Sequence, residues 1–223
     1  MIEIKNTTKR FLAGLVLFFL TSIAISPRTN AAGFDKNYLA QRQAGADLVS
    51  RMRDLRPARN NTSTGLMKIR HPGGNLIEVP VLIRTIVTLT NWQSIYATTT
   101  SLPLVVVQSH EGPNEYKRLR TAGVGPVPNL AGATVLSTPF YPFAGSEFWL
   151  FDLGLGFVQW PDQRVTGTSI RKGQRCHVLE SSTPHPASGG YSRVVSWVDL
   201  DTLGIVHAEA YDARSRLLKV FDP

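Results

Sequence analysis

The spacing of hydrophobic residues changes along the chain from a helical period to a strand-like one. From Lys36 to Leu55, apolar side chains recur near helical spacing on one side and arginines occupy the other sides. Asp35 is placed to cap this helix and Pro57 to end it. From Gly65 onward, short runs rich in valine, isoleucine, threonine and aromatic residues alternate with turn-forming residues, as strands do. The pattern predicts one N-terminal helix followed by a chain that is mostly β-structure.

The predicted strands fall into two groups separated by a long loop. The first group consists of Leu66 to His71, Leu76 to Leu89, Gln93 to Thr99 and Leu104 to His110. The second group consists of Leu155 to Trp160, Arg164 to Ile170, Gln174 to Ser181, Ser192 to Leu200, Ile205 to Tyr211 and Leu217 to Phe221. Tight turns within the second group force neighbouring strands to be antiparallel. Between the groups, Glu111 to Ala133 carries repeated glycine and proline and predicts a long loop, and the role of its Gly123 to Gly132 stretch stays open.

The stretch GSEFWLFDLGLGFVQWPDQ, from Gly145 to Gln163, concentrates large apolar and aromatic side chains. Ser146 is placed to cap a short helix that starts at Glu147 and ends at Gly154. A helix that is apolar nearly all round must be buried, or must face something apolar that is not protein. The segment is therefore either a plug that closes the core or a lid that contacts lipid.

The N-terminus has the form of a secretory signal peptide. Three basic residues precede the apolar run Phe11 to Ile25, and small residues follow it up to Ala31 and Ala32. The run is shorter than the roughly 20 residues that a bilayer span needs. We expect residues 1–32 to be a signal peptide cleaved after Ala31 or Ala32, and residues 33–223 to form one soluble, periplasmic domain.

The chain is basic, with 24 Lys and Arg against 16 Asp and Glu. Small basic clusters occur at Arg51 to Arg59 and Lys117 to Arg120, without the interleaved aromatic residues of a nucleic-acid interface. These clusters predict a solvated face or weak attraction to anionic lipid headgroups, and they exclude nucleic acid as the expected partner of an exported protein. The single cysteine, Cys176, excludes an intrachain disulfide and a Cys-based zinc site.

Residues that carry catalysis are not grouped in any familiar pattern. There is no Gly-x-Ser-x-Gly motif, and the five histidines are not spaced as metal pairs. We therefore expect no enzyme, cofactor or metal, although an envelope hydrolase that uses His177 and His207 stays open as an alternative. Abundant apolar strand surface without convergent polar groups instead favours a hydrophobic container.

The C-terminal part, from Phe140 to Phe221, resembles the outer membrane lipoprotein-sorting protein family, in its spirochaete-type subfamily with a LolA/LolB-like carrier fold. The resemblance rests on PFAGSEFWLFDLG, GFVQWPDQRV, RKGQRCHVLES, SRVVSWVDLDTLGIVHAEAYD and LLKVFD, and the earlier GLMKIR and NWQSIYAT fit its N-terminal strands. It implies an α+β fold, an unclosed antiparallel β-barrel (half-barrel) with helices covering its mouth. The residues that match as structural signatures are Gly145, Ser146, Asp152, Leu153, Trp160, Pro161, Cys176 and Trp197 to Asp199, while Ser215 replaces a common glycine and predicts a looser last turn.

The function that this resemblance implies is a periplasmic carrier or chaperone for acyl chains of lipoproteins or of a phospholipid. An inner-membrane releasing complex or an outer-membrane receptor would then be its partner, and the oligomeric state stays open. The alternative is a lipid-sensing regulatory module that acts on an inner-membrane signalling partner. Apolarity and placement in the predicted elements select the candidate cavity walls Val81, Ile83, Ile86, Leu104, Val106, Phe148, Phe151 and Phe157.

Overall fold

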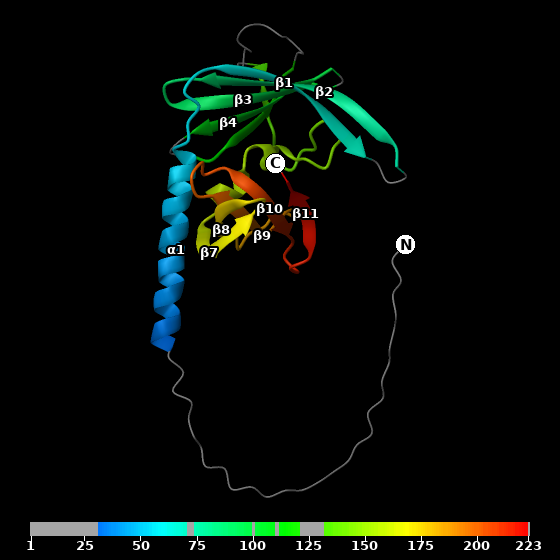
Figure 1. Cartoon of the computed structure of the whole chain (residues 1–223). Helices are drawn as coiled ribbons and strands as arrows, with labels where there is room; N and C mark the ends of the chain where they lie inside the picture. Colours follow the sequence, from blue (N-terminus) through cyan, green and yellow to red (C-terminus); the bar gives the residue numbers. More distant parts are fainter. Residues whose placement is uncertain (1–30, 71–73, 100, 110–111, 121–131, 223) are drawn as a thin grey trace, which may run out of the picture.

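Two antiparallel sheets and one long helix make up most of the chain in this computed structural model (Figure 1), which describes residues 31–70, 74–99, 101–109, 112–120 and 132–222. The first sheet has the order β1-β2-β3-β4-β5-β6 and the second has the order β11-β10-β9-β8-β7. The helical elements are α1 (Ala31–Arg53), α2 (Leu150–Leu153) and the 3₁₀ helix η2 (Gly156–Gln159). The first-sheet strands are β1 (Asn61–Arg70), β2 (Leu76–Val87), β3 (Asn91–Thr98), β4 (Leu104–Ser109), β5 (Glu115–Arg118) and β6 (Thr134–Val135). The second-sheet strands are β7 (Asp162–Arg171), β8 (Gln174–Ser182), β9 (Arg193–Asp199), β10 (Ile205–Tyr211) and β11 (Leu217–Phe221).

Neither sheet closes on itself, because β1 and β6 are the edges of one and β7 and β11 the edges of the other. Every neighbouring pair of strands is antiparallel, as the short connections predict. In Figure 1, the first sheet lies above the second, α1 runs down one side of the second sheet, and the chain between β6 and β7 passes between the two. The predicted α+β class with unclosed antiparallel structure is therefore confirmed.

Helix α1 is held on the second sheet at a glycine. A Cβ atom on Gly45 would stand 2.4 Å from the backbone C and O atoms of Gln163, so the helix backbone lies directly against β7. Leu48 and Val49, one turn further on, are buried in the core of the second sheet. The predicted helix is confirmed, but the predicted N-cap at Asp35 is wrong because the helix begins four residues earlier, at Ala31.

The segment that contains α2 and η2 packs on both sheets. Leu150, which is fully buried, joins the cluster on the inner face of the first sheet. The next residue, Phe151, joins the core of the second sheet together with Phe157 and Val158. The helix is thus the plug that one of the two sequence interpretations described.

The bounds of this segment differ from the prediction. The helix starts at Leu150 instead of Glu147, because the Asp152 carboxylate accepts the N–H of Trp149 at 2.8 Å while Ser146 closes a separate turn with Phe143. The predicted strand Leu155 to Trp160 is wrong, since these aromatic side chains are buried by turning between the sheets and not by strand pairing.

The other differences lie in connections. Strand β5 forms inside the predicted loop, and the Gly123 to Gly132 stretch falls almost entirely outside the described residues. The turn before β11 is tight and not loose: Ser215 adopts a left-handed φ of 58°. The Asp212 carboxylate fixes that turn by accepting the N–H groups of Arg214 and Arg216 at 2.8 and 2.9 Å.

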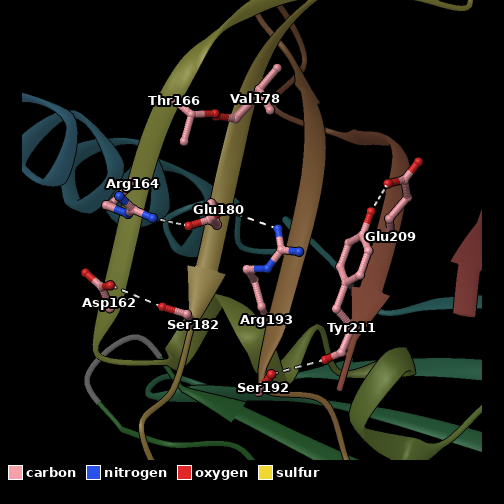
Figure 2. A network of polar contacts seen from close by, with 10 residues as sticks. All are labelled: Asp162, Arg164, Thr166, Val178, Glu180, Ser182, Ser192, Arg193, Glu209 and Tyr211. Atoms are coloured by element: carbon pink, nitrogen blue, oxygen red, sulfur yellow. Dashed lines mark hydrogen bonds and ion pairs between the residues drawn. The ribbon is translucent and has the colours of Figure 1, made fainter. Parts of the chain in front are cut away.

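The outward face of the second sheet carries a row of polar contacts (Figure 2). Glu180 lies between Arg164 and Arg193 and forms an ion pair with each of them. These side chains alternate along their strands with buried ones such as Leu179 and Val194, which point to the opposite face. The apolar face of this sheet is therefore the one that faces α1, α2 and the first sheet.

Candidate functional site

Two apolar cavities meet where α2, η2 and the second sheet come together. The first, of about 270 Å³, lies between the end of α1, the ends of β3 and β4, η2 and the turn between β9 and β10. The second, of about 220 Å³, lies between α2 and strands β10 and β11. Leu155 and Ile205 line both cavities. The two side chains therefore mark the boundary between the cavities.

Leu155 stands at this boundary in a conformation that leucine rarely adopts. Its φ is 47°, in the left-handed region, which costs a bulky side chain roughly 1–2 kcal/mol. Leu203, which lines the first cavity, has a φ of 58°. Both side chains are apolar, and Leu155 is 39% exposed although its neighbours Phe157 and Val158 are buried. Both leucines with a left-handed backbone therefore lie in turns beside the first cavity.

A buried ion pair fixes α2 to the edge strand β11. Lys219 Nζ lies 2.8 Å from Asp152 Oδ2, and these side chains are only 11% and 3% exposed. Tyr191 donates its hydroxyl proton to Asp152 Oδ1 at 3.0 Å, and the Lys219 ammonium lies 3.9 Å from the centre of the Trp149 ring. The plug is thus held by a charged clamp beside the second cavity, which Asp152 also lines.

The electrostatics of the clamp follow from its burial. Burial raises the pKa of Asp152 above its ordinary value, and the hydrogen bonds from Lys219, Trp149 and Tyr191 offset part of that rise. Burial and the Asp152 charge raise the pKa of Tyr191, so its hydroxyl keeps the proton that it donates. Removing the charge of either Asp152 or Lys219 would consequently abolish much of the electrostatic attraction between α2 and β11.

Two polar side chains in the wall of the first cavity, Asn114 and Gln159, satisfy each other's hydrogen bonds. Gln159 accepts the N–H of Asn114 at 2.8 Å and donates its own amide proton to Asn114 Oδ1 at 2.6 Å. Asn114 also donates to the Gly154 carbonyl at 2.7 Å. Burial raises the pKa of the neighbouring Tyr116 to about 12. These bonds tie the first sheet to η2 and satisfy the side-chain amides of Asn114 and Gln159.

The aromatic residues predicted as cavity walls are divided between cavity and core. Phe148 and Phe157 line the second cavity. Phe151 is buried and stacks on Phe140, with ring centres 5.0 Å apart, and it lines neither of the two cavities. The sequence therefore placed two of these three side chains beside the apolar space.

The predicted strand residues lie mostly on one face. Val81, Leu104 and Val106 are buried in the inner cluster of the first sheet, where Phe143 and Leu150 cover them. They line neither cavity, because the chain's own plug occupies that position.

The two isoleucines predicted as walls lie on opposite faces of β2. Ile83 pairs with Tyr96 on the inner face and is 37% exposed. Ile86 packs on the other face, with Ile95 and Val105, since side chains alternate along a strand. Ile86 therefore does not belong with the other predicted strand residues.

Several residues that line the first cavity were not among the predicted walls. They are Met52, Leu55, Trp92, Leu155, Leu203 and Ile205. A usable signal is an apolar residue inside a turn next to glycine, as in Gly154-Leu155-Gly156 and Leu203-Gly204.

The two histidines of the hydrolase alternative do not line either cavity. His207 is buried, with Nδ1 2.8 Å from Asp222 and Nε2 2.9 Å from the Arg171 guanidinium. These contacts tie β10 to β7 and to the C-terminal end of the chain. Within the described residues, no group of His, Cys, Asp and Glu could hold a metal ion.

Solved structures share this architecture. A DUF1329 family protein from Desulfovibrio piger is similar with a TM-score of 0.61 and 22% identity, over 81% of this chain and 77% of that one. A domain described as an outer membrane lipoprotein-sorting protein domain, from Vibrio parahaemolyticus, is similar with a TM-score of 0.62 and 18% identity, over 80% and 76%. At these identities the likeness shows the fold alone, which this chain shares with both proteins. The resemblance seen in the sequence is thereby confirmed at the level of the fold.

Two further comparisons give a lower TM-score or cover less of this chain. A LolA superfamily protein from Nitrosomonas europaea has a TM-score of 0.49 and 14% identity, over 81% of this chain and 76% of that one. A family model described as an uncharacterized protein matches residues 135–222, which run from β6 to β11. No curated protein matches the chain.

Proposed function

We propose that the protein is a carrier that binds acyl chains of lipoproteins or lipids in the two cavities beside Leu155. The observation that carries this proposal is the pair of adjoining apolar cavities, lined in common by Leu155 and Ile205, within a lipoprotein-sorting fold. Burying one methylene group is favourable by about 0.8 kcal/mol, so moving a 16-carbon chain from an apolar site into water costs roughly 10 kcal/mol. A carrier must offset most of that cost with apolar surface of its own.

The size of the cavities fits one acyl chain if Leu155 moves. Ligand pockets commonly enclose about 300–1,000 Å³, and each cavity alone is smaller than that. A movement of Leu155 that includes its backbone would join them into one elongated space, and the strain at its φ of 47° lowers the cost of that movement. An elongated apolar space suits a hydrocarbon chain better than a compact ligand.

Filling the space between the cavities should prevent binding. We expect Ile205→Trp to weaken binding of a fluorescent C16 fatty acid at least about tenfold, because the indole displaces two or more methylenes of the chain. Fluorescence titration of the purified protein measures this affinity. Ile170→Trp on β7, where the side chain is 74% exposed, is the matched control and should bind as the native protein does. Unchanged binding by Ile205→Trp, or a native protein that binds no fatty acid, would contradict the proposal.

The compartment that we propose is the periplasm, with residues 1–32 acting as a signal peptide. Among the described residues, no helix combines the length and the hydropathy that a bilayer span requires. An inner-membrane releasing complex and an outer-membrane receptor are the proposed partners. Pull-down from envelope extracts should recover assorted lipoproteins, whereas recovery of one transmembrane signalling protein would favour a regulatory module.

The signal peptide can be tested on the exported protein. We expect Edman sequencing of material purified from the periplasm to begin at Ala32 or Gly33, since cleavage after Ala31 or Ala32 leaves those residues first. Subcellular fractionation is the companion measurement. A mature chain that still begins at Met1, or that stays in the cytoplasm, would exclude this location.

A further inference from the structure

The basic cluster at the end of α1 opens onto the first apolar cavity. A bowl of about 580 Å³ is lined by Arg53, Asp54 and Arg56 from the end of α1 and by Leu89, Thr90, Asn91, Trp92 and Ser109 from the first sheet. Arg53, Trp92 and Ser109 line the first cavity as well. The bowl and the first cavity therefore adjoin at these three side chains, and we call the bowl the headgroup bowl.

We propose that the headgroup bowl binds the phosphate of an amphiphile whose acyl chain lies in the two cavities. This inference rests on the proposed carrier function and specifies its cargo as an anionic phospholipid. The bowl and the cavities follow the order of headgroup and acyl chain in such a molecule. Charged side chains lie outermost, the Trp92 ring lies at the boundary and apolar side chains lie inside. Tryptophan suits such a boundary because one end of its ring system is apolar and the other can donate a hydrogen bond.

The charge of the bowl favours an anion. Its lining contains two arginines, Arg53 and Arg56, and one acid, Asp54. Guanidinium groups bind phosphate through paired hydrogen bonds, which is why arginine recurs in phosphate sites.

The arginines are held in place by backbone carbonyls. Arg56 donates to the carbonyls of Leu89 and Thr88, the former at 3.0 Å, and Arg53 donates to the carbonyl of Gly112 at 3.5 Å. A neutral carbonyl orients the Arg56 guanidinium but does not cancel its charge. The bowl is thus organised before a ligand arrives.

The opposite wall is equally ordered. Thr88 donates its N–H to the Asn91 carbonyl at 2.8 Å, and its hydroxyl accepts the N–H of Asn91 at 3.1 Å. Thr90, at the tip of this turn, is exposed and faces the bowl. A charge introduced at Thr90 would consequently change the potential in the bowl without removing an arginine.

The test compares two amphiphiles that share a C12 chain and a glycerol unit: lauroyl lysophosphatidic acid, which is anionic, and monolaurin, which is neutral. We expect isothermal titration calorimetry to show tighter binding of the anionic one. Thr90→Glu should weaken binding of the anionic amphiphile about tenfold and leave monolaurin unaffected, because one negative charge then faces the phosphate. Thr90→Gln is the matched control and should behave as the native protein. Arg56→Gln should weaken the same amphiphile selectively.

The outcomes separate this inference from the carrier proposal. Equal affinity for both amphiphiles, or no effect of Thr90→Glu on the anionic one, would overturn the headgroup bowl while leaving the carrier intact. Inorganic phosphate alone should not compete at millimolar concentration, and effective competition would show a site for free phosphate instead of a lipid. Binding of neither amphiphile would refute the carrier itself.

Discussion

Replacing Gly45 with alanine should lower the free energy of unfolding by about 2–3 kcal/mol, because overpacking a tight contact costs that much. The new Cβ would stand 2.4 Å from backbone atoms of Gln163, which no side-chain rotation can relieve. Alanine favours a helix over glycine by about 1 kcal/mol, but the clash is larger and decides the sign. Thermal unfolding should show a melting temperature lower by about 5–10 °C.

Gly65→Ala is the control for this substitution. A Cβ on Gly65 in β1 meets nothing within 4 Å, so its melting temperature should stay close to that of the native protein. Because Met52 and Leu55 line the first cavity from the end of α1, Gly45→Ala should also weaken fatty-acid binding. If the two glycine variants were equally stable, α1 would not pack on β7 as described.

The second large effect is expected from the ion pair that clamps α2. Asp152→Asn should destabilise the protein by about 3–5 kcal/mol, because it leaves the Lys219 ammonium buried without a counter-charge. Lys219→Met should destabilise the protein by a similar amount, because it leaves the Asp152 carboxylate buried without a counter-charge. The double variant should be much less destabilised than the sum of the two, since neither charge is then left unpaired. Urea denaturation of the four proteins gives the coupling energy, which we expect to be about 2–3 kcal/mol.

The exposed pair Lys68 and Glu78 on β1 and β2 provides the comparison. Their atoms are 3.0 Å apart, but the side chains are 62% and 45% exposed. The same cycle there, with Lys68→Met and Glu78→Gln, should give a coupling of only about 0.5 kcal/mol, because water screens the charges. Equal couplings at the two sites would mean that the clamp contributes no more than a surface pair.

The strands were predictable because runs of valine, isoleucine, threonine and aromatic residues are separated by turn-forming residues. Strands β7 to β11 lie within two residues of their predicted bounds, and β2 to β4 are equally close. The α2 and η2 region was not predictable to the same degree, since its aromatic residues carry no clear period. Leu150 faces one sheet and Phe151 the other, and a single sequence does not tell which partner each side chain meets.

The candidate site was less predictable than the fold for a related reason. Val81, Leu104 and Val106 were predicted as cavity walls, but whether their face of the sheet is open or filled depends on Phe143 and Leu150, which lie far along the chain. The two cavities described above lie where several separate elements meet. Their walls are set by the packing of those elements and not by any local pattern.

The position of α1 also sets the order in which the protein can fold. Its buried face, with Leu48 and Val49, packs against strands that begin at Asp162 and are synthesised much later. Contacts between such distant parts of a chain form slowly, and the apolar surfaces that await them stay exposed meanwhile. The nascent chain therefore needs protection from aggregation until β7 to β10 have emerged.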